Sequence, residues 1–243
     1  MVRKSRPGAV AVVLAAGSGT RMGADRNKAY LPLAGRRMLS WSLSSIAEVP
    51  ELVRTILVIR ADDRARATST LDREVPDLPV EIIDGGSSRH QSEYRALQHL
   101  AADIESGAVD IVLIHDAARP LAGPGMMRSA ITVARQFGGA VPGVEVRDLV
   151  TMDEAGNLGD LRPEDRHVRV QTPQAFQALP LLHAYRAADA EQFEGTDTSS
   201  SVEKFSDIEV RSFQGDPRNM KVTFSQDLFL AERLLAGAHH RLK

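Results

Sequence analysis

The sequence predicts an α/β protein: a mostly parallel, Rossmann-like sheet in three layers, from which a β-arm projects. Short apolar runs of strand length alternate with segments whose apolar residues recur at helical spacing, which is typical of parallel βαβ units. This alternation stops at about residue 144 and resumes after about residue 172, and the stretch between them predicts the arm.

The first predicted strand, residues 9–16, is nearly all apolar, as expected of a parallel strand that is covered on both faces. By the same criteria we expect further strands at residues 53–59, 80–84, 111–115 and 209–213. Helical spacing predicts helices at residues 39–46, 62–73, 94–104, 126–137, 179–188 and 228–236, the last with Ser225 as its N-cap.

The predicted arm covers about residues 144–172 and contains a turn at Glu154-Ala155-Gly156-Asn157. The chain has no internal repeat, low-complexity linker or block of like charge. We therefore expect one domain over residues 1–243, with the arm as an excursion from it.

Composition excludes several classes of protein. The 30 Lys and Arg residues are balanced by 32 Asp and Glu residues, which disfavours a nucleic-acid partner and requires local cations for any anionic ligand. The absence of cysteine excludes disulfides, thiolate metal sites and cysteine nucleophiles. The apolar run at residues 9–16 is too short to span a membrane and leads into a glycine loop, so we expect a cytoplasmic protein without a signal peptide.

Four segments at predicted strand ends carry unusual residues, and ligands of open parallel sheets bind beyond the carboxyl ends of strands. The first is Leu-Ala-Ala-Gly-Ser-Gly-Thr-Arg-Met-Gly at residues 14–23, followed by Asn27 and Lys28. Its small residues let the backbone approach a phosphate chain, and Arg21 and Lys28 add positive charge. The spacing fits neither a Walker loop nor G-x-G-x-x-G. The alternative is a strand-to-helix turn with two solvated cations.

The second segment is Asp-Gly-Gly-Ser-Ser-Arg at residues 84–89, with Ser92 one helical turn later. Two adjacent glycines allow a base ring to lie against the backbone, where N–H and hydroxyl groups can read a pyrimidine edge. A turn followed by an N-capped helix is the structural alternative.

The third segment, His-Asp-Ala-Ala-Arg-Pro at residues 115–120, places Asp116 at the end of a buried strand. A carboxylate there suits a Mg²⁺ ion that bridges triphosphate oxygens, and Arg119 suits an anionic substrate. The alternative is an internal Asp–Arg pair that rigidifies the loop, and His115 is interpreted as a packed strand residue.

The fourth segment, Asn-Met-Lys-Val-Thr at residues 219–223, is interpreted as an apolar strand that contains Lys221. Burying a lysine is costly unless it meets an anion. The alternative is an edge-strand lysine that faces water.

Taken in order, these segments resemble the 2-C-methyl-D-erythritol 4-phosphate cytidylyltransferases, and the resemblance covers nearly the whole chain. The glycine loop is shared by nucleotidyltransferases at large, whereas H-D-A-A-R-P and Q-T-P-Q are specific. The matching elements are the glycine loop, Lys28-Ala-Tyr, D-G-G-x-x-R, H-D-A-A-R-P, Val146-Arg147-Asp148, Q-T-P-Q at residues 171–174, Thr196-Asp197 and N-M-K-V-T.

The resemblance implies a nucleotidyltransferase-type fold and a role for each matching residue. The nucleotide would be bound by Ala15, Ala16, Gly17, Ser18, Gly19, Gly86, Ser87, Ser92 and Ala117. The triphosphate would be surrounded by the catalytic residues Arg21, Lys28 and Lys221, with Asp116 beside a Mg²⁺ ion. The polyol phosphate would be met by Arg119, Thr196 and Asp197 and by an arginine of the arm, Arg166 or Arg162. In this family the arm exchanges between subunits, which implies a homodimer.

The implied reaction joins CMP from CTP to 2-C-methyl-D-erythritol 4-phosphate and releases pyrophosphate, in non-mevalonate isoprenoid precursor synthesis. Its nucleophile is a phosphate monoester that is already anionic at pH 7, so it needs no dedicated general base. The expected catalysis is positioning and electrostatic stabilisation by cations.

The sequence also departs from the family pattern. Leu149 follows Val146-Arg147-Asp148 where the family has Thr, Thr198-Ser199-Ser200 replaces the usual acidic or small continuation, and Glu93 replaces an aliphatic residue. Because these departures gather on the acceptor side, a cytidylyltransferase for another polyol phosphate, such as ribitol 5-phosphate, is the nearest alternative.

Two alternatives come from other classes of protein. A non-catalytic nucleotide-binding module would not need Lys28, Asp116 and Lys221 together. A Rossmann-type oxidoreductase would need G-x-G-x-x-G and an acidic residue at the end of the second strand, and the sequence has neither.

Overall fold

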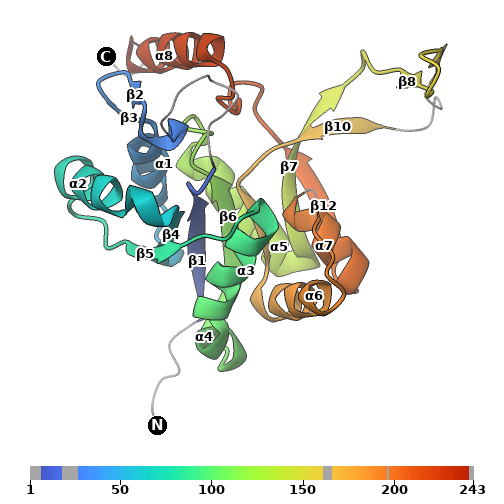
Figure 1. Cartoon of the computed structure of the whole chain (residues 1–243), viewed down its shortest axis with the longest axis horizontal. Coiled ribbons are helices and arrows are strands. Elements are labelled where there is room, and N and C mark those ends of the chain that lie inside the picture. Colours follow the sequence, from blue (N-terminus) through green and yellow to red (C-terminus); the bar gives the residue numbers. More distant parts are fainter. Residues whose placement is uncertain (1–6, 18–26, 161–165, 196, 241–243) are drawn as a thin grey trace.

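The computed structural model describes residues 7–17, 27–160, 166–195 and 197–240. Within these residues, eight strands form one mixed sheet in the order β10-β7-β11-β6-β1-β4-β5, and β12 pairs with β7 (Figure 1). The strands are β1 (Gly8–Leu14), β4 (Leu52–Ile59), β5 (Glu81–Asp84), β6 (Val109–Asp116), β7 (Gly138–Val146), β10 (His167–Val170), β11 (Gln174–Gln177) and β12 (Glu209–Gln214).

Half of this sheet is parallel. β1 pairs with β4 and β6 in parallel, and β4 pairs with β5 in the same way. The chain runs from β1 outward through β4 to β5 and then returns to place β6 on the other side of β1. This reversal next to β1 creates a crevice at the carboxyl ends of the strands, where open α/β sheets bind ligands.

The sheet is covered on both faces because alternate side chains of each strand point to opposite sides. On one face, Ala11 and Val13 of β1 pack with α1 (Met38–Ala47), α2 (Arg64–Glu74) and α5 (Pro124–Phe137). On the other face, Val10 and Val12 pack with α3 (Arg89–His99), α4 (Ala101–Glu105), α6 (Ala178–Ala190) and α7 (Thr198–Phe205). This double burial explains the uninterrupted apolar run of β1.

The half of the sheet beyond β6 is mixed and carries the arm. β11 runs antiparallel to β6 and β7, whereas β12 is parallel to β7. The end of β7 continues with β10 as an antiparallel ribbon, and β8 (Thr151–Met152) pairs with β9 (Leu158–Gly159) near its tip. Figure 1 shows this arm projecting from the body of the molecule.

The predicted fold class is confirmed. Short elements that lie outside the main sheet and its covering helices include η2 (Lys28–Tyr30), β2 (Pro32–Leu33), β3 (Arg36–Arg37) and η3 (Ala61–Asp63). The closing helix α8 (Ser225–His240) packs on Leu33, Met38 and Val222. Among the described residues, none of the helices combines the length and apolar character that crossing a bilayer demands.

Three local predictions were wrong. The helix predicted at residues 94–104 begins at Arg89 and is divided at Leu100 into α3 and α4. Residues 219–223 form an irregular connection instead of a strand, because the backbone of this segment bonds locally, to Ala118 and to the side chains of Lys28 and Arg119. Ser225 is the first residue of α8 and not its N-cap. The Asp227 carboxylate accepts the backbone N–H groups of Thr223 and Phe224, which precede the helix.

Among the elements that were missed, β11 and α7 show two different reasons. β11 is short and has glutamine at both ends, so its apolar content is too low for the strand criterion. α7 has the serine-rich sequence TSSSVEKF, which has low intrinsic helix propensity. Its N-terminus is stabilised by a capping box in which the Asp197 side chain accepts from the Ser200 backbone.

Candidate active site

A cavity of about 630 Å³ lies at the carboxyl ends of β1, β4, β5 and β6. Its volume is within the range of small-molecule sites. The predicted site residues on its lining come from all four motif segments, and they are Ala16, Gly17, Lys28, Gly86, Ser87, Ser92, Asp116 and Lys221.

Asp116, the last residue of β6, is the buried anion of this pocket. One carboxylate oxygen is paired with Arg89, and the other lies 2.8 Å from Lys221 Nζ and 3.9 Å from Arg119 Nε. The backbone N–H of Asp116 donates to Thr172 Oγ1 at 3.0 Å. Burial by itself raises the pKa of the Asp116 carboxyl, but Arg89 and Lys221 outweigh burial and hold this pKa well below its usual range.

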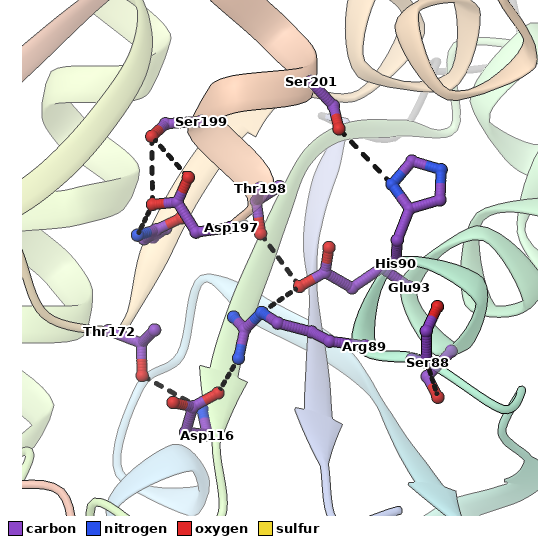
Figure 2. Close-up of polar contacts among 12 residues, drawn as sticks. Ser88, Arg89, His90, Glu93, Asp116, Thr172, Asp197, Thr198, Ser199 and Ser201 are labelled. Atoms are coloured by element: carbon purple, nitrogen blue, oxygen red, sulfur yellow. Dashed lines mark hydrogen bonds and ion pairs between the residues drawn. The ribbon is translucent and has the colours of Figure 1, made fainter. Parts of the chain in front are cut away.

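Arg89, the first residue of α3, lies between two carboxylates (Figure 2). Its guanidinium contacts Asp116 on one side, and on the other its Nε lies 2.9 Å from Glu93 Oε1. Ser88 fixes the start of the helix, because its hydroxyl accepts the backbone N–H of Gln91 at 3.1 Å. Arg89 is therefore held at the floor of the pocket from both sides.

Lys28 and Lys221 bring positive charge to the same side of the pocket. Lys28 Nζ donates to the carbonyl of Val222 at 2.9 Å, which ties η2 to the connection that carries Lys221. Asn27 orients η2, because its side chain donates to the carbonyl of Ala15 and to Asp63 and accepts the N–H of Ala29.

The two glycines after β5 allow the chain to pass close to the end of β1. A Cβ atom at Gly85 would lie 2.8 Å from Ala16 Cβ, and one at Gly86 would lie 2.3 Å from Gln91 Cβ. The N–H of Gly86 donates to Ser92 Oγ at 3.1 Å, and Ser92 Oγ donates to the carbonyl of Ser88 at 2.9 Å. This segment is thus a pre-formed wall of the pocket.

Ala15 and Ala117 lie beneath the pocket and not on its lining. Both are buried in the core, and their N–H groups donate to the carbonyls of Val58 and Leu14. They support the floor of the pocket, and a contact between either residue and the nucleotide stays a prediction.

The residues predicted for the acceptor side have protein partners. Arg119 donates to the carbonyl of Asn219 at 2.8 Å, and Asp197 accepts from Gln174 Nε2 at 3.2 Å as well as capping α7. Arg166 lies on the arm, where it is exposed and 3.7 Å from Glu145. The pocket lining described above includes none of these three.

Five of the residues singled out lie outside the described residues: Ser18, Gly19, Arg21, Thr196 and Arg162. The roles implied for them stay predictions.

Sequence reasoning missed Arg60 and Arg89, which both line the pocket. Arg89 ends the D-G-G-x-x-R motif, so its motif position was a usable signal. Arg60 follows β4 directly, and its position at a parallel strand end was the available signal.

The described residues include no group of three or more His, Cys, Asp or Glu side chains that could hold a metal by themselves. Mg²⁺ usually binds one or two carboxylates and completes its coordination with water and substrate phosphates. The donor set around Asp116 therefore fits an ion that arrives with a triphosphate better than a resident ion.

The fold and the pocket together define a class of protein. A crevice at the strand ends of an α/β sheet, lined by glycines, lysines and one buried carboxylate, is typical of enzymes that bind a nucleotide through its phosphates.

The chain belongs to the 2-C-methyl-D-erythritol 4-phosphate cytidylyltransferase family, whose profile matches residues 9–237. The resemblance drawn from the motifs is thereby confirmed. The predicted enzyme class is confirmed as well, since members of this family are cytidylyltransferases.

Individual relatives agree with this assignment. The chain is 38% identical to the 2-C-methyl-D-erythritol 4-phosphate cytidylyltransferase of Cereibacter sphaeroides, over 94% of this chain and 97% of that protein. It is 37% identical to the enzyme of the same name from Geobacillus kaustophilus, over 93% and 96%.

Solved structures agree as well. The 4-diphosphocytidyl-2C-methyl-D-erythritol synthase of Anaerococcus prevotii superposes with a TM-score of 0.82 at 28% identity, over 95% of this chain and 96% of that one. The 2-C-methyl-D-erythritol 4-phosphate cytidylyltransferase of Thermus thermophilus superposes with a TM-score of 0.72 at 26% identity, over 93% and 98%.

Proposed function

We propose that this protein transfers the cytidylyl group of CTP to 2-C-methyl-D-erythritol 4-phosphate and releases pyrophosphate, a step of non-mevalonate isoprenoid precursor synthesis. The observation that carries the proposal is the convergence of Lys28, Asp116 and Lys221, from three separate segments, on one pocket in a member of this family. A non-catalytic nucleotide-binding module would have no use for that combination.

In the proposed reaction, a phosphate oxygen of the acceptor attacks the α-phosphorus of CTP. A new P–O bond forms, the bond to the bridging oxygen of the β-phosphate breaks, and pyrophosphate leaves. The main obstacle is the approach of two anions and the charge that develops on the leaving group. Lys28 and Lys221 suit this task, because the protein fixes each ammonium group at 2.8–2.9 Å from an oxygen atom near the pocket.

The proposed nucleotide site lies between the end of β1 and the wall formed by the loop after β5. Gly17 leaves open space beside the backbone, since no atom of the described residues lies within 4 Å of the position a Cβ would take. Gly86, Ser87 and Ser92 would face the cytosine ring. Ser18, Gly19 and Arg21, which complete the glycine loop in the sequence, would enclose the triphosphate.

We propose Mg²⁺ as the metal that accompanies CTP, with Asp116 as its protein ligand. The carboxylate remains charged across the physiological pH range, because Arg89 and Lys221 hold its pKa low. When bound, the ion would neutralise charge on the triphosphate and orient it. Arg89 and Lys221 stabilise the same carboxylate, so they would position this ligand.

The proposed acceptor site lies beside Asp116 toward α7 and the arm. Arg119 donates to the carbonyl of Asn219 and so links the pocket floor to residues 219–223. Asp197 is the N-cap of α7. Together with Thr196 these residues would hold the polyol phosphate, and Arg166 or Arg162 would reach it from an arm.

Exposed apolar side chains on the arm support the proposal of a homodimer. Met152 and Leu158 face each other in the β8–β9 pair and are 71% and 72% exposed. Isolated two-stranded ribbons are only marginally stable, and exposed apolar clusters mark interaction surfaces. Light scattering should give the mass of two chains, and Met152→Asp together with Leu158→Asp should shift it to one. The control is Phe229→Asp on α8, and a single-chain mass for the wild type would contradict the proposal.

Two further features remain proposals. The single domain over residues 1–243 is supported by the one sheet that connects both halves of the chain. The cytoplasmic location is supported by the cysteine-free sequence.

The deciding experiment measures pyrophosphate release with CTP and Mg²⁺, comparing 2-C-methyl-D-erythritol 4-phosphate with ribitol 5-phosphate. We expect release with the first acceptor alone, and loss of release in Lys221→Ala. The matched control is Lys204→Ala, which removes a surface lysine that pairs with Glu191. Release with ribitol 5-phosphate alone would assign a different acceptor, and release with neither would overturn the proposed function.

A further inference from the structure

The surroundings of Asp116 contain an excess of positive charge. Among the described residues, Arg89, Lys221 and Arg119 all face this one carboxylate, within 3.9 Å. If nothing offset them, these cations would leave a net charge of about two positive units where a divalent ion must approach. A further negative charge close by would therefore make the approach of the cation more favourable.

Glu93 places a carboxyl group behind the pocket. It lies one helical turn after Arg89 on α3, and its side chain is 1% exposed. Its Oε1 is 2.9 Å from Arg89 Nε and accepts a hydrogen bond from Thr198 Oγ1 at 3.0 Å, while its other oxygen accepts from the Tyr185 hydroxyl. Each of these partners can donate to a carboxylate.

A buried carboxylate is costly unless it is paired and hydrogen-bonded. Burial is the largest effect on the pKa of Glu93 and raises it, whereas Arg89, Tyr185 and Thr198 stabilise the charged form and only partly offset burial. A carboxylate on this part of α3 has a structural cost that an aliphatic side chain would avoid.

Figure 2 shows a series of contacts from Asp116 to Arg89, from Arg89 to Glu93 and from Glu93 to Thr198. These contacts join β6, α3 and the first turn of α7. Glu93 and Thr198 contact each other directly, although 105 residues separate them in the chain.

We propose that Glu93 is a positioning residue that shares Arg89 with Asp116 and thereby keeps enough negative charge at Asp116 for a magnesium–nucleotide complex. The inference rests on the proposed function. Glu93 touches neither substrate nor metal in this arrangement, because it lies behind Arg89 and does not line the pocket. Its effect passes through the guanidinium of Arg89.

The test is calorimetric binding of CTP over a range of Mg²⁺ concentrations. In Glu93→Gln, whose side chain has nearly the same shape, Arg89 has Asp116 as its one remaining anionic partner. We expect the Mg²⁺ concentration for half-maximal CTP binding to rise about tenfold, because one buried negative charge is lost. CTP binding in EDTA should be as strong as in the wild type or stronger, since the pocket becomes more positive.

Two variants separate charge from packing. Glu93→Val with Thr198→Glu moves the carboxylate across the 3.0 Å contact to α7 and should restore the wild-type Mg²⁺ dependence. Ser201→Ala is the control, because it removes another contact between α7 and α3, the one with His90, and leaves Arg89 alone. Its Mg²⁺ dependence should not change.

The proposal is overturned if Glu93→Gln keeps the wild-type Mg²⁺ dependence, whether or not the variant loses thermal stability. Wild-type protein that binds no CTP at any Mg²⁺ concentration would overturn the proposed function, and this inference with it. The two failures are distinguishable, because the first concerns the variant and the second concerns the wild type.

Discussion

Replacing Asp116 by Asn tests the electrostatic description of the pocket most directly. The substitution keeps the shape of the side chain and removes the charge that Arg89 and Lys221 share. Breaking a buried ion pair from one side costs about 3–5 kcal/mol. We expect a loss of about 3 kcal/mol in the free energy of unfolding, at the low end, since Arg89 keeps Glu93 and Lys221 is 38% exposed to water.

Urea denaturation followed by circular dichroism at pH 7 measures this loss. The matched control is Asp110→Asn, because Asp110 pairs with Arg135 at 2.8 Å on the surface, where such pairs contribute less than about 1 kcal/mol. In addition, CTP binding to Asp116→Asn should no longer depend on Mg²⁺. If Asp116→Asn costs no more stability than the control and keeps the Mg²⁺ dependence, the assignment of Asp116 as a buried, metal-facing carboxylate is refuted.

Three further predictions concern other parts of the molecule. Lys28→Ala should lower kcat by about 100- to 1,000-fold with the fold intact, the effect of losing one preorganised donor, and near-normal turnover would contradict its role. Gly86→Ala should weaken CTP binding in calorimetry, because the new Cβ would lie 2.3 Å from Gln91 Cβ; unchanged affinity would remove the loop after β5 from the nucleotide site. Arg54 lowers the pKa of Glu81 from 4.5 to about 2, so this pair stabilises the fold above pH 4.5 and loses its contribution as the pH falls toward 2. Glu81→Gln should flatten that part of the stability–pH curve, and an unchanged slope would show that the pair does not contribute.

Local patterns in the sequence were sufficient to predict the parallel half of the sheet. β1 is an uninterrupted apolar run because it is buried on both faces. This apolar run can be recognised in the sequence without knowing which elements pack against it. The same holds for the residues at strand ends. Because carboxyl ends of parallel strands meet at one edge, Gly17, Gly86 and Asp116 could be placed in one pocket from their positions in the chain.

Where the chain has no regular period, prediction was less successful. Residues 219–223 look like a strand from their apolar content, but their backbone bonds to local groups, to Ala118 and to the side chains of Lys28 and Arg119. α7 has a serine-rich sequence, and its helix depends on the cap provided by Asp197. In both cases the decisive hydrogen bonds involve specific side chains or single loop residues, which a hydrophobic pattern does not record.

The composition and order of the residues were enough to determine the fold class, the position of the pocket and the family, since each depends on short motifs or on periodic burial. Only the tertiary structure decided how charge is distributed inside the pocket. Arg89 meets Asp116 across 27 residues and Glu93 meets Thr198 across 105. Electrostatic energy depends on distance and burial, and both are set by packing between elements that are remote in the chain.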